Sequence, residues 1–222
     1  MAALTPDVSL VTGVATVTPW YRVTASALGS EVAGSSGDLS GTVADSGGKL
    51  SLSGTPPAVL ANGGSEMTRQ PFTPPWSIED GDIIEVRWTS IAAAAASSWQ
   101  LGVMLSGTTV SAQGTLQCGI YGATSRGGNI GSDNASTELT ESATLGEVVG
   151  LMQTSEGGNV CSVMAQATTA AGALVDANAR RSVSYTVDAY RLYIVHGTVN
   201  TSQDTGAISG FCDVRRIRRD TT

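Results

Sequence analysis

Four carboxylates near the middle of the chain come closest to forming a reactive group. Glu79, Asp80, Asp82 and Glu85 lie within one short stretch. A retaining glycosidase needs two carboxyl groups about 5 Å apart. Successive strand residues point to opposite faces, so Asp82 and Glu85 are expected to point apart, with Glu85 in solvent. We therefore predict that the protein is not an enzyme, and keep a β-sandwich glycosidase using Asp80, Asp82 and Glu85 as the least favoured alternative.

The same stretch holds the first candidates for a metal site, and Asp133 and Asn134 are the other possible oxygen donors. Calcium prefers hard oxygen ligands, which Asp80 and Asp82 could supply, but no fuller ligand set surrounds them. Cys118, Cys161 and Cys212 are far apart without a C-x-x-C spacing, which excludes structural zinc. We predict no cofactor and no metal, with Asp80 and Asp82 as weak calcium candidates.

The single histidine, His196, is the one candidate base for a serine or cysteine nucleophile. It lies in the apolar run YRLYIVHG, on the same strand face as Leu192 and Ile194. No G-x-S-x-G motif accompanies it. We therefore predict that His196 is a packed, hydrogen-bonded strand residue.

Tryptophans and arginines are the candidates for binding surfaces. Because an indole can stack on a sugar ring, Trp20 and Trp99 are possible glycan contacts. Trp76 follows a Pro-Pro pair and is expected either to anchor an arm in a neighbouring subunit or to contribute to a sugar site. Four arginines at the end of the last expected strand would either dock an acidic surface or form ion pairs within the strand end. They are Arg215, Arg216, Arg218 and Arg219.

Composition excludes several classes of partner. The chain has 222 residues, a net charge of −7 and only 14% charged residues. A negative charge repels a phosphate backbone, so we expect no nucleic-acid partner. No apolar stretch is long enough to span a membrane, and residues 1–10 do not resemble a signal peptide. We expect a protein made inside a cell, without membrane insertion.

Short apolar runs separated by turns predict an all-β protein with little helix. The clearest run is 82–91, where Ile84, Val86 and Trp88 share one face. Further strands are predicted at 99–105, 114–121, 148–153, 159–166, 182–187, 190–199 and 208–217. This spacing is typical of an antiparallel β-sandwich of jelly-roll type. Helix is expected at most at 92–96 and 168–181.

The chain divides, by composition, near residue 75. Residues 1–75 are expected to form N-terminal strands and a proline-rich arm at 55–75, because proline cannot supply a continuous ladder of donors. This segment is expected to pack on a jelly-roll domain formed by residues 76–222. Within that domain, the glycine-rich segment 125–136 is expected to be an outward-facing loop.

Two resemblances add to these predictions. The segment DGDIIE at 80–85 loosely resembles the E-x-D-x-x-E pattern of laminarinase-like glycoside hydrolases, but its first position is Asp80. The runs DGDIIEVRW, WQLGVMLSG, YRLYIVHGTV and ISGFCDVRRI together resemble concanavalin-like or jelly-roll domains of virion proteins in tailed bacteriophages and gene transfer agents. That second resemblance covers roughly 78–217. It rests on the general character of these runs and not on an invariant motif.

The virion resemblance implies a function carried by surfaces. Such domains serve as head decorations, head spikes, or tail and fibre components, often as trimers, and some bind host glycans. We therefore expect a non-enzymatic structural component of a phage-like particle, with copies of itself and other virion proteins as partners. The alternative is a lectin-like module that binds a host surface polysaccharide.

Overall fold

Nearly all of the residues that can be described lie in β-strands. The computed structural model describes residues 15–33, 41–55, 67–93, 99–106, 115–121, 126–132, 135–141, 145–154, 160–169, 171, 173–184, 189–198 and 205–219. Within these ranges the only helical turn is a 3-10 turn at Ala25–Ala27. The prediction of an all-β chain with little helix is confirmed. No helix in this described part is long and apolar enough to cross a membrane.

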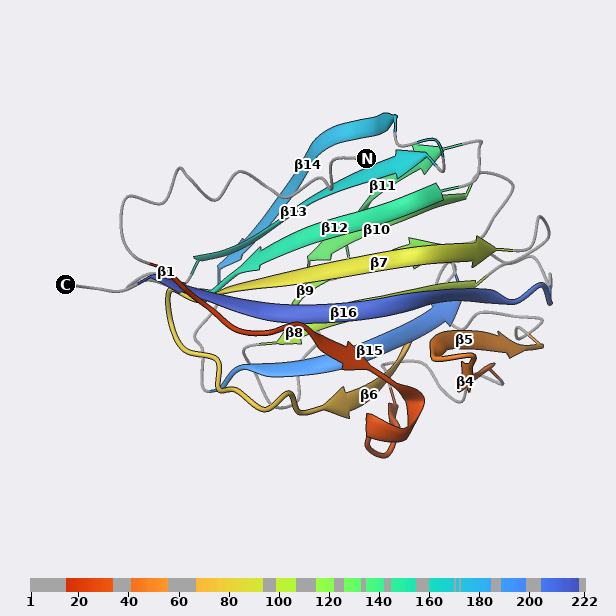
Figure 1. The fold of residues 1–222 in the computed structure, drawn as a ribbon, viewed down its shortest axis with the longest axis horizontal. Helices are drawn as coiled ribbons and strands as arrows, with labels where there is room; N and C mark the ends of the chain where they lie inside the picture. Colours follow the sequence, from red (N-terminus) through yellow and green to blue (C-terminus); the bar gives the residue numbers. More distant parts are fainter. Residues whose placement is uncertain are drawn as a thin grey trace.

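Two antiparallel sheets pack face to face (Figure 1). The first, sheet A, has the order β14-β13-β12-β7-β16-β5-β4, and β1 and β2 also pair with β16. Its strands are β1 (Ala15–Val17), β2 (Tyr21–Val23), β4 (Gly41–Ser46), β5 (Lys49–Gly54), β7 (Ile83–Ala93), β12 (Leu145–Gln153), β13 (Val160–Thr169), β14 (Leu174–Ser184) and β16 (Ile208–Arg219).

The second, sheet B, has the order β11-β10-β9-β8-β15-β6-β3. Its strands are β3 (Val32–Ala33), β6 (Met67–Phe72), β8 (Trp99–Ser106), β9 (Thr115–Tyr121), β10 (Arg126–Ser132), β11 (Ala135–Glu141) and β15 (Arg191–Thr198). Strands from before residue 75 therefore belong to both sheets, beside strands from after it.

The core lies between the sheets and follows the period-two alternation of the sequence. Ile84, Val86 and Trp88 of β7 are all fully buried, as predicted. Trp99 and Leu101 of β8 contribute from the facing sheet. Every residue of β8 is buried, so this strand is covered on both of its faces.

A tight hairpin joins β4 and β5, at one end of the strand order of sheet A. Gly47 and Gly48 connect β4 to β5 with φ angles of +61° and +79°. Two successive positive φ angles are what a two-residue hairpin turn requires, and glycine adopts them without steric cost.

The expected arm at 55–75 is wrong over its second half. Met67–Phe72 is β6, which pairs with β15 on one side and with β3 on the other. Pro71 fits this strand because its carbonyl accepts a hydrogen bond from Gly29 N at 2.7 Å, away from β15. In an antiparallel strand the N–H and C=O of one residue point to the same side, so the missing N–H costs no bond to β15.

Two other local predictions are also wrong. The possible helix at 168–181 lies in β13 and β14, and most of the expected loop at 125–136 lies in β10 and β11. These segments are rich in alanine or glycine and carry little side-chain signal of their own, so pairing with neighbouring strands decides their conformation. Of the other possible helix, residues 92 and 93 belong to β7, and 94–98 lie outside the described residues.

Candidate functional site

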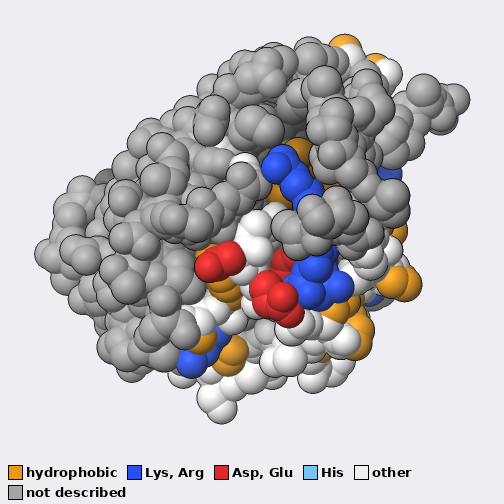
Figure 2. All heavy atoms as spheres, turned by 90° about the vertical axis from the view of Figure 1, so that its left-hand side faces the viewer, with side chains coloured by type: hydrophobic (Ala, Val, Ile, Leu, Met, Phe, Trp, Pro, Cys, Tyr) orange, Lys and Arg blue, Asp and Glu red, His pale blue; other side chains and the backbone are white. Residues whose placement is uncertain are grey.

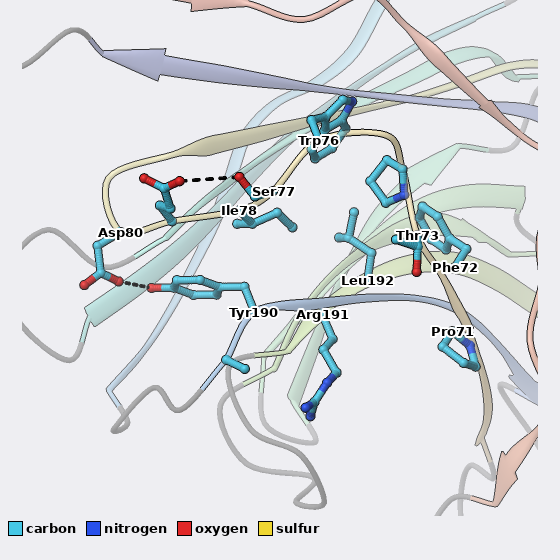
Figure 3. A pocket seen from close by; sticks show the side chains of 13 residues that line it. Pro71, Phe72, Thr73, Trp76, Ser77, Ile78, Asp80, Tyr190, Arg191 and Leu192 are labelled. Carbon is cyan, nitrogen blue, oxygen red and sulfur yellow. Dashed lines mark hydrogen bonds between the residues drawn. The ribbon is translucent and has the colours of Figure 1, made fainter.

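A cavity of about 730 Å³ opens at one end of the sandwich. Its walls are the connection from β6 to β7, at 73–82, and the start of β15. Because Leu192 pairs with Phe72, the beginning of β15 lies beside the end of β6 (Figure 3). The lining side chains include Phe72, Thr73, Trp76, Ser77, Ile78, Glu79, Asp80, Tyr190, Arg191 and Leu192.

Asp82 fixes the shape of the connection that forms one wall. Its Oδ2 accepts a hydrogen bond from Glu79 N at 2.8 Å, and its own N–H donates to Glu79 O at 3.2 Å. Gly81 completes this turn with a φ of +84°, which favours glycine. Thr154, after β12, lies within hydrogen-bonding distance of the carbonyl oxygens of Glu79 and Asp82, at 2.9 and 3.0 Å.

An internal ion pair lies behind this turn. Arg218 of β16 donates from Nε to Oδ1 of Asp82 and from Nη2 to Oδ2, both at 2.8 Å, and Asp82 is fully buried. The Nη1 atom of Arg218 lies 3.0 Å from Glu79 Oε1. These contacts with Asp82 raise the pKa of Arg218. A bidentate guanidinium pair of this kind is both strong and geometrically specific.

The ion pair bears on Asp82 as a weak calcium candidate. Both carboxylate oxygens of Asp82 face a cationic guanidinium, which would repel a second cation. Asp80 Oδ1 is 2.6 Å from the Tyr190 hydroxyl, which donates to it. No group of three metal-ligating side chains occurs within the described ranges. The prediction that Asp80 and Asp82 could hold calcium is therefore wrong for Asp82.

Asp80 and Tyr190 form the mouth of the cavity. Figure 3 shows the Tyr190 ring reaching from the start of β15 toward Asp80, with Ile78 beside it. The hydrogen bond to Asp80 holds the ring in place. Figure 2 looks at this end of the sandwich and shows acidic and basic side chains gathered side by side there.

This arrangement has the chemistry of a sugar site. An aromatic ring offers a flat apolar surface to the C–H face of a pyranose, and carboxylates and hydroxyls accept and donate hydrogen bonds to its hydroxyl groups. The cavity brings together the aromatic Tyr190, the hydroxyls of Thr73 and Ser77, and the carboxylate of Asp80. Mostly apolar walls with a few polar groups are typical of small-molecule sites.

The tryptophans predicted to bind partners have different positions. Trp99 is fully buried in the core, so the prediction of a glycan contact is wrong for it. Trp76 is half-buried and packs against the core of its own chain while lining the cavity, which differs from an anchor in a neighbouring subunit. Trp20 is 36% exposed, and the Arg215 guanidinium lies 4.3 Å from the centre of its ring. One face of the Trp20 indole is thereby covered by a cation.

The arginines at the end of β16 are used inside the protein. Arg215 Nε donates to Glu85 Oε2 at 2.5 Å, and Arg216 Nη1 donates to Ser77 O at 2.8 Å. With Arg218 bound to Asp82, the alternative of an ion-paired strand end is the one that the structure favours. Arg219, at the end of the strand, is exposed. The four arginines therefore do not form a cationic surface that is free to bind an acidic partner.

Asp80, Asp82 and Glu85, the carboxylates of the glycosidase alternative, do not come together in one site. Glu85 is 3% exposed and pairs with Arg215 across the β7–β16 register, so the expectation that it is solvated is wrong. Asp82 is buried beneath the turn, and Asp80 lies at the cavity mouth. Two of the three are thus neutralised by arginines.

His196 is buried, as predicted, but its ring is not hydrogen-bonded to any described residue. Neither ring nitrogen has such a partner within this part of the chain, and Nε2 lies 3.7 Å from Glu31 Oε1. Burial lowers its pKa to about 4. Cys118 and Cys212 are buried free thiols, and burial raises the pKa of Cys118 to about 12. These groups are not poised for acid–base or nucleophilic chemistry.

Sequence reasoning missed Tyr190 and Arg191 as site residues. The run YRLYIVHG was identified as a strand, but its first two residues were not singled out. Their place in the site depends on the pairing of β15 with β6, which carries the connection at 73–82 to them. The one local signal was the aromatic residue at the point where the strand begins.

Comparisons with known proteins bear on the fold. No family model and no curated protein matches the sequence. Lectin I-B4 from Griffonia simplicifolia superposes with a TM-score of 0.51 and 9% identity, over 90% of this chain and 99% of that one. Arcelin-5, a lectin-like defence protein from Phaseolus vulgaris, gives 0.49 and 12% identity, over 92% and 99%.

A protein of unknown function from Shewanella oneidensis MR-1 is also similar, with a TM-score of 0.46 and 11% identity over 100% of this chain and 98% of that one. At such identities only the fold is shared. The chain therefore has an antiparallel β-sandwich fold of the concanavalin-like type that legume lectins have, as the sequence predicted.

Proposed function

We propose that this protein is a carbohydrate-binding module that holds a glycan in the cavity between the 73–82 connection and the start of β15, without cleaving it. The cavity itself carries the proposal, because it combines the Tyr190 ring with the Asp80 carboxylate and nearby hydroxyls. The concanavalin-like sandwich is compatible with this function, since sandwiches of this type occur among lectins.

Binding would use groups that are already in place. The Tyr190 ring, held by its hydrogen bond to Asp80, would stack on the apolar face of a sugar ring without a large loss of side-chain entropy. Asp80, Thr73 and Ser77 would bond the ring hydroxyls. The internal pair of Arg218 and Asp82 would keep the wall rigid. No side chain in this scheme acts on a glycosidic bond.

Removing the Tyr190 ring is the direct test. Isothermal titration with a glycan chosen from an array is expected to show at least a tenfold weaker affinity for Tyr190→Ala, a loss of about 1.4 kcal/mol. Asp80→Asn, which removes the charge but keeps the shape, is expected to weaken binding as well.

Trp20→Ala is the matched control, because Trp20 is an exposed aromatic residue outside the cavity lining. It is expected to bind as the wild type does. Equal affinities of wild type and Tyr190→Ala, or loss of binding in Trp20→Ala alone, would place the glycan elsewhere. An array on which the wild type binds nothing would overturn the proposal.

A structural role in a phage-like particle is a second proposal, and it rests on the sequence resemblance. The structural observation that favours it is a pair of exposed apolar side chains on the N-terminal segment that pairs with β16: Val17 of β1, 44% exposed, and Trp20, just before β2. Apolar groups at a sheet edge suit contact between subunits.

Light scattering after size exclusion tests self-association. We expect a homotrimer whose mass does not fall as salt increases, because the arginines of β16 are paired internally. Val17→Asp is expected to shift the trimer to monomer. A monomeric wild type at all concentrations would contradict the self-association, and would leave glycan binding untouched.

A further inference from the structure

The side chain of Arg191 differs in its contacts from most of the arginines whose side chains the structure describes. Arg22, Arg87, Arg215 and Arg218 each pair with a carboxylate, and Arg216 bonds a backbone carbonyl. The main chain of Arg191 pairs with Ser106 of β8, but among the described residues no hydrogen bond or ion pair engages its side chain, which lines the cavity. Its guanidinium thus brings a positive charge to the cavity that no carboxylate of the described part neutralises.

The two carboxylates that line the cavity, those of Glu79 and Asp80, already have partners within the protein. Glu79 lies 3.0 Å from Arg218, and Asp80 accepts the hydrogen bond of Tyr190. Figure 3 shows Asp80 at the tip of the Tyr190 ring, while Arg191 extends from the strand in a different direction. The cavity therefore has an acceptor side, at Asp80, and a cationic side, at Arg191.

A guanidinium without a partner matches a carboxylate better than it matches a hydroxyl. Its planar fork binds both oxygens of a carboxylate in parallel hydrogen bonds, and such charge-assisted bonds are roughly twice as strong as neutral ones. Thr73, which also lines the cavity, could add a hydroxyl bond to the same ligand. A sugar acid would supply both a carboxylate for Arg191 and hydroxyls for Asp80.

We propose that the cavity recognises an acidic saccharide, a hexuronic or nonulosonic acid unit, whose carboxylate pairs with Arg191 while Tyr190 stacks on its ring. This inference rests on the glycan-binding function proposed above and specifies its ligand class. The chain's net charge of −7 opposes an anionic ligand at long range. At about 0.15 M salt that repulsion is screened beyond about 8 Å, so the local contact decides.

Carboxyl reduction of the ligand gives the sharpest test. The probes are polygalacturonate, alginate, hyaluronan and colominic acid, each compared by titration with its carboxyl-reduced form, in 0.15 M salt. The wild type is expected to bind at least one acidic form ten times more tightly than the reduced form. Arg191→Gln is expected to abolish that preference, and Arg191→Lys to keep part of it, because lysine has the charge without the fork.

Arg69→Gln is the matched control. Arg69 also lacks a carboxylate partner among the described residues and also lies in a strand of sheet B, but it does not line the cavity. The substitution changes the net charge equally and is expected to keep the acidic preference. If Arg69→Gln and Arg191→Gln weaken binding to the same extent, the effect is one of net charge and the inference is overturned.

The outcomes separate this inference from the function on which it rests. A wild type that binds the reduced and acidic forms equally, with loss of binding in Tyr190→Ala, overturns the acidic preference and supports the glycan site. A wild type that binds neither acidic nor neutral glycans overturns both. An acidic preference that persists in Arg191→Gln overturns the role of Arg191 alone.

Discussion

Replacing Arg218 by leucine is expected to lower the free energy of unfolding by about 3–5 kcal/mol. The substitution leaves the Asp82 carboxylate fully buried and without its bidentate partner. A buried charge that loses its counter-ion costs far more than an exposed one, because water cannot replace the lost contact. Chemical denaturation at pH 7 measures the change.

The ion pair of Arg22 and Asp213, at the surface, is the control for the buried pair of Arg218 and Asp82. Arg22→Gln breaks the pair with Asp213, in which the Arg22 side chain is 44% exposed, and is expected to cost less than about 1 kcal/mol. The double variant Asp82→Asn with Arg218→Leu is expected to recover part of the loss, because no unpaired charge remains. A similar small cost for Arg218→Leu and Arg22→Gln would show that Asp82 is solvated in the protein.

The same substitution should also disturb the cavity. Asp82 bonds Glu79 N, and Arg218 holds both carboxylates at the turn that forms one wall. We therefore expect Arg218→Leu to weaken glycan binding in addition to stability, although Arg218 does not line the cavity. In this respect Arg218 is a positioning residue.

Acid is expected to destabilise the protein through His196. Burial lowers the pKa of His196 to about 4, below the ordinary value of about 6.5. The unfolded chain then binds more protons than the folded chain between these two values. The contribution of His196 to the free energy of unfolding is therefore fully present above about pH 6.5. It is lost as the pH drops toward 4, by about 3 kcal/mol in total.

The single histidine makes this prediction easy to isolate. Carboxyl groups titrate mostly below pH 5, so between pH 7.5 and 5.0 His196 is the main group to change charge. We expect the unfolding free energy of the wild type to fall by about 2 kcal/mol over that interval. Denaturant titrations at the two pH values measure it.

His196→Leu is the control, because leucine fills a similar volume without titrating. Its unfolding free energy is expected to change little between pH 7.5 and 5.0. The Glu31 carboxylate, 3.7 Å from Nε2, would stabilise the protonated ring and reduce the wild-type loss. An equal loss in wild type and His196→Leu would show that another group is responsible.

The alternation of apolar and polar residues correctly predicted strands and their buried faces where both kinds of side chain are large. In β7, Ile84, Val86 and Trp88 face the core, and in β16 Cys212 and Val214 do the same. The signal failed in β10 and β14, where glycine or alanine replaces the large side chains. It also failed at β6, where Pro71 suggested a loop. Proline was acceptable there because β3 covers only Arg69 and Thr68 on that side of the strand.

The site was predictable only in its parts. The sequence drew attention to Asp82 as a possible metal ligand and to Arg218 as a possible dock, but the two residues bind each other. They are 136 positions apart, and only the pairing of β16 with β7 brings them together. Charge and residue type were visible in the sequence, whereas the identity of each partner depended on the topology of the sheets.

Strand β16 has a consequence for how the protein folds. It pairs with β7 along one edge and with β5, β2 and β1 along the other, so that Thr16 lies opposite Arg218. Every one of these partners is synthesised before β16. Closing such distant pairs costs chain entropy before any contact stabilises them, which slows folding to milliseconds or longer. During synthesis, the edges of β7 and β5 that β16 covers therefore stay unpaired until β16 has left the ribosome, and unpaired strand edges favour aggregation.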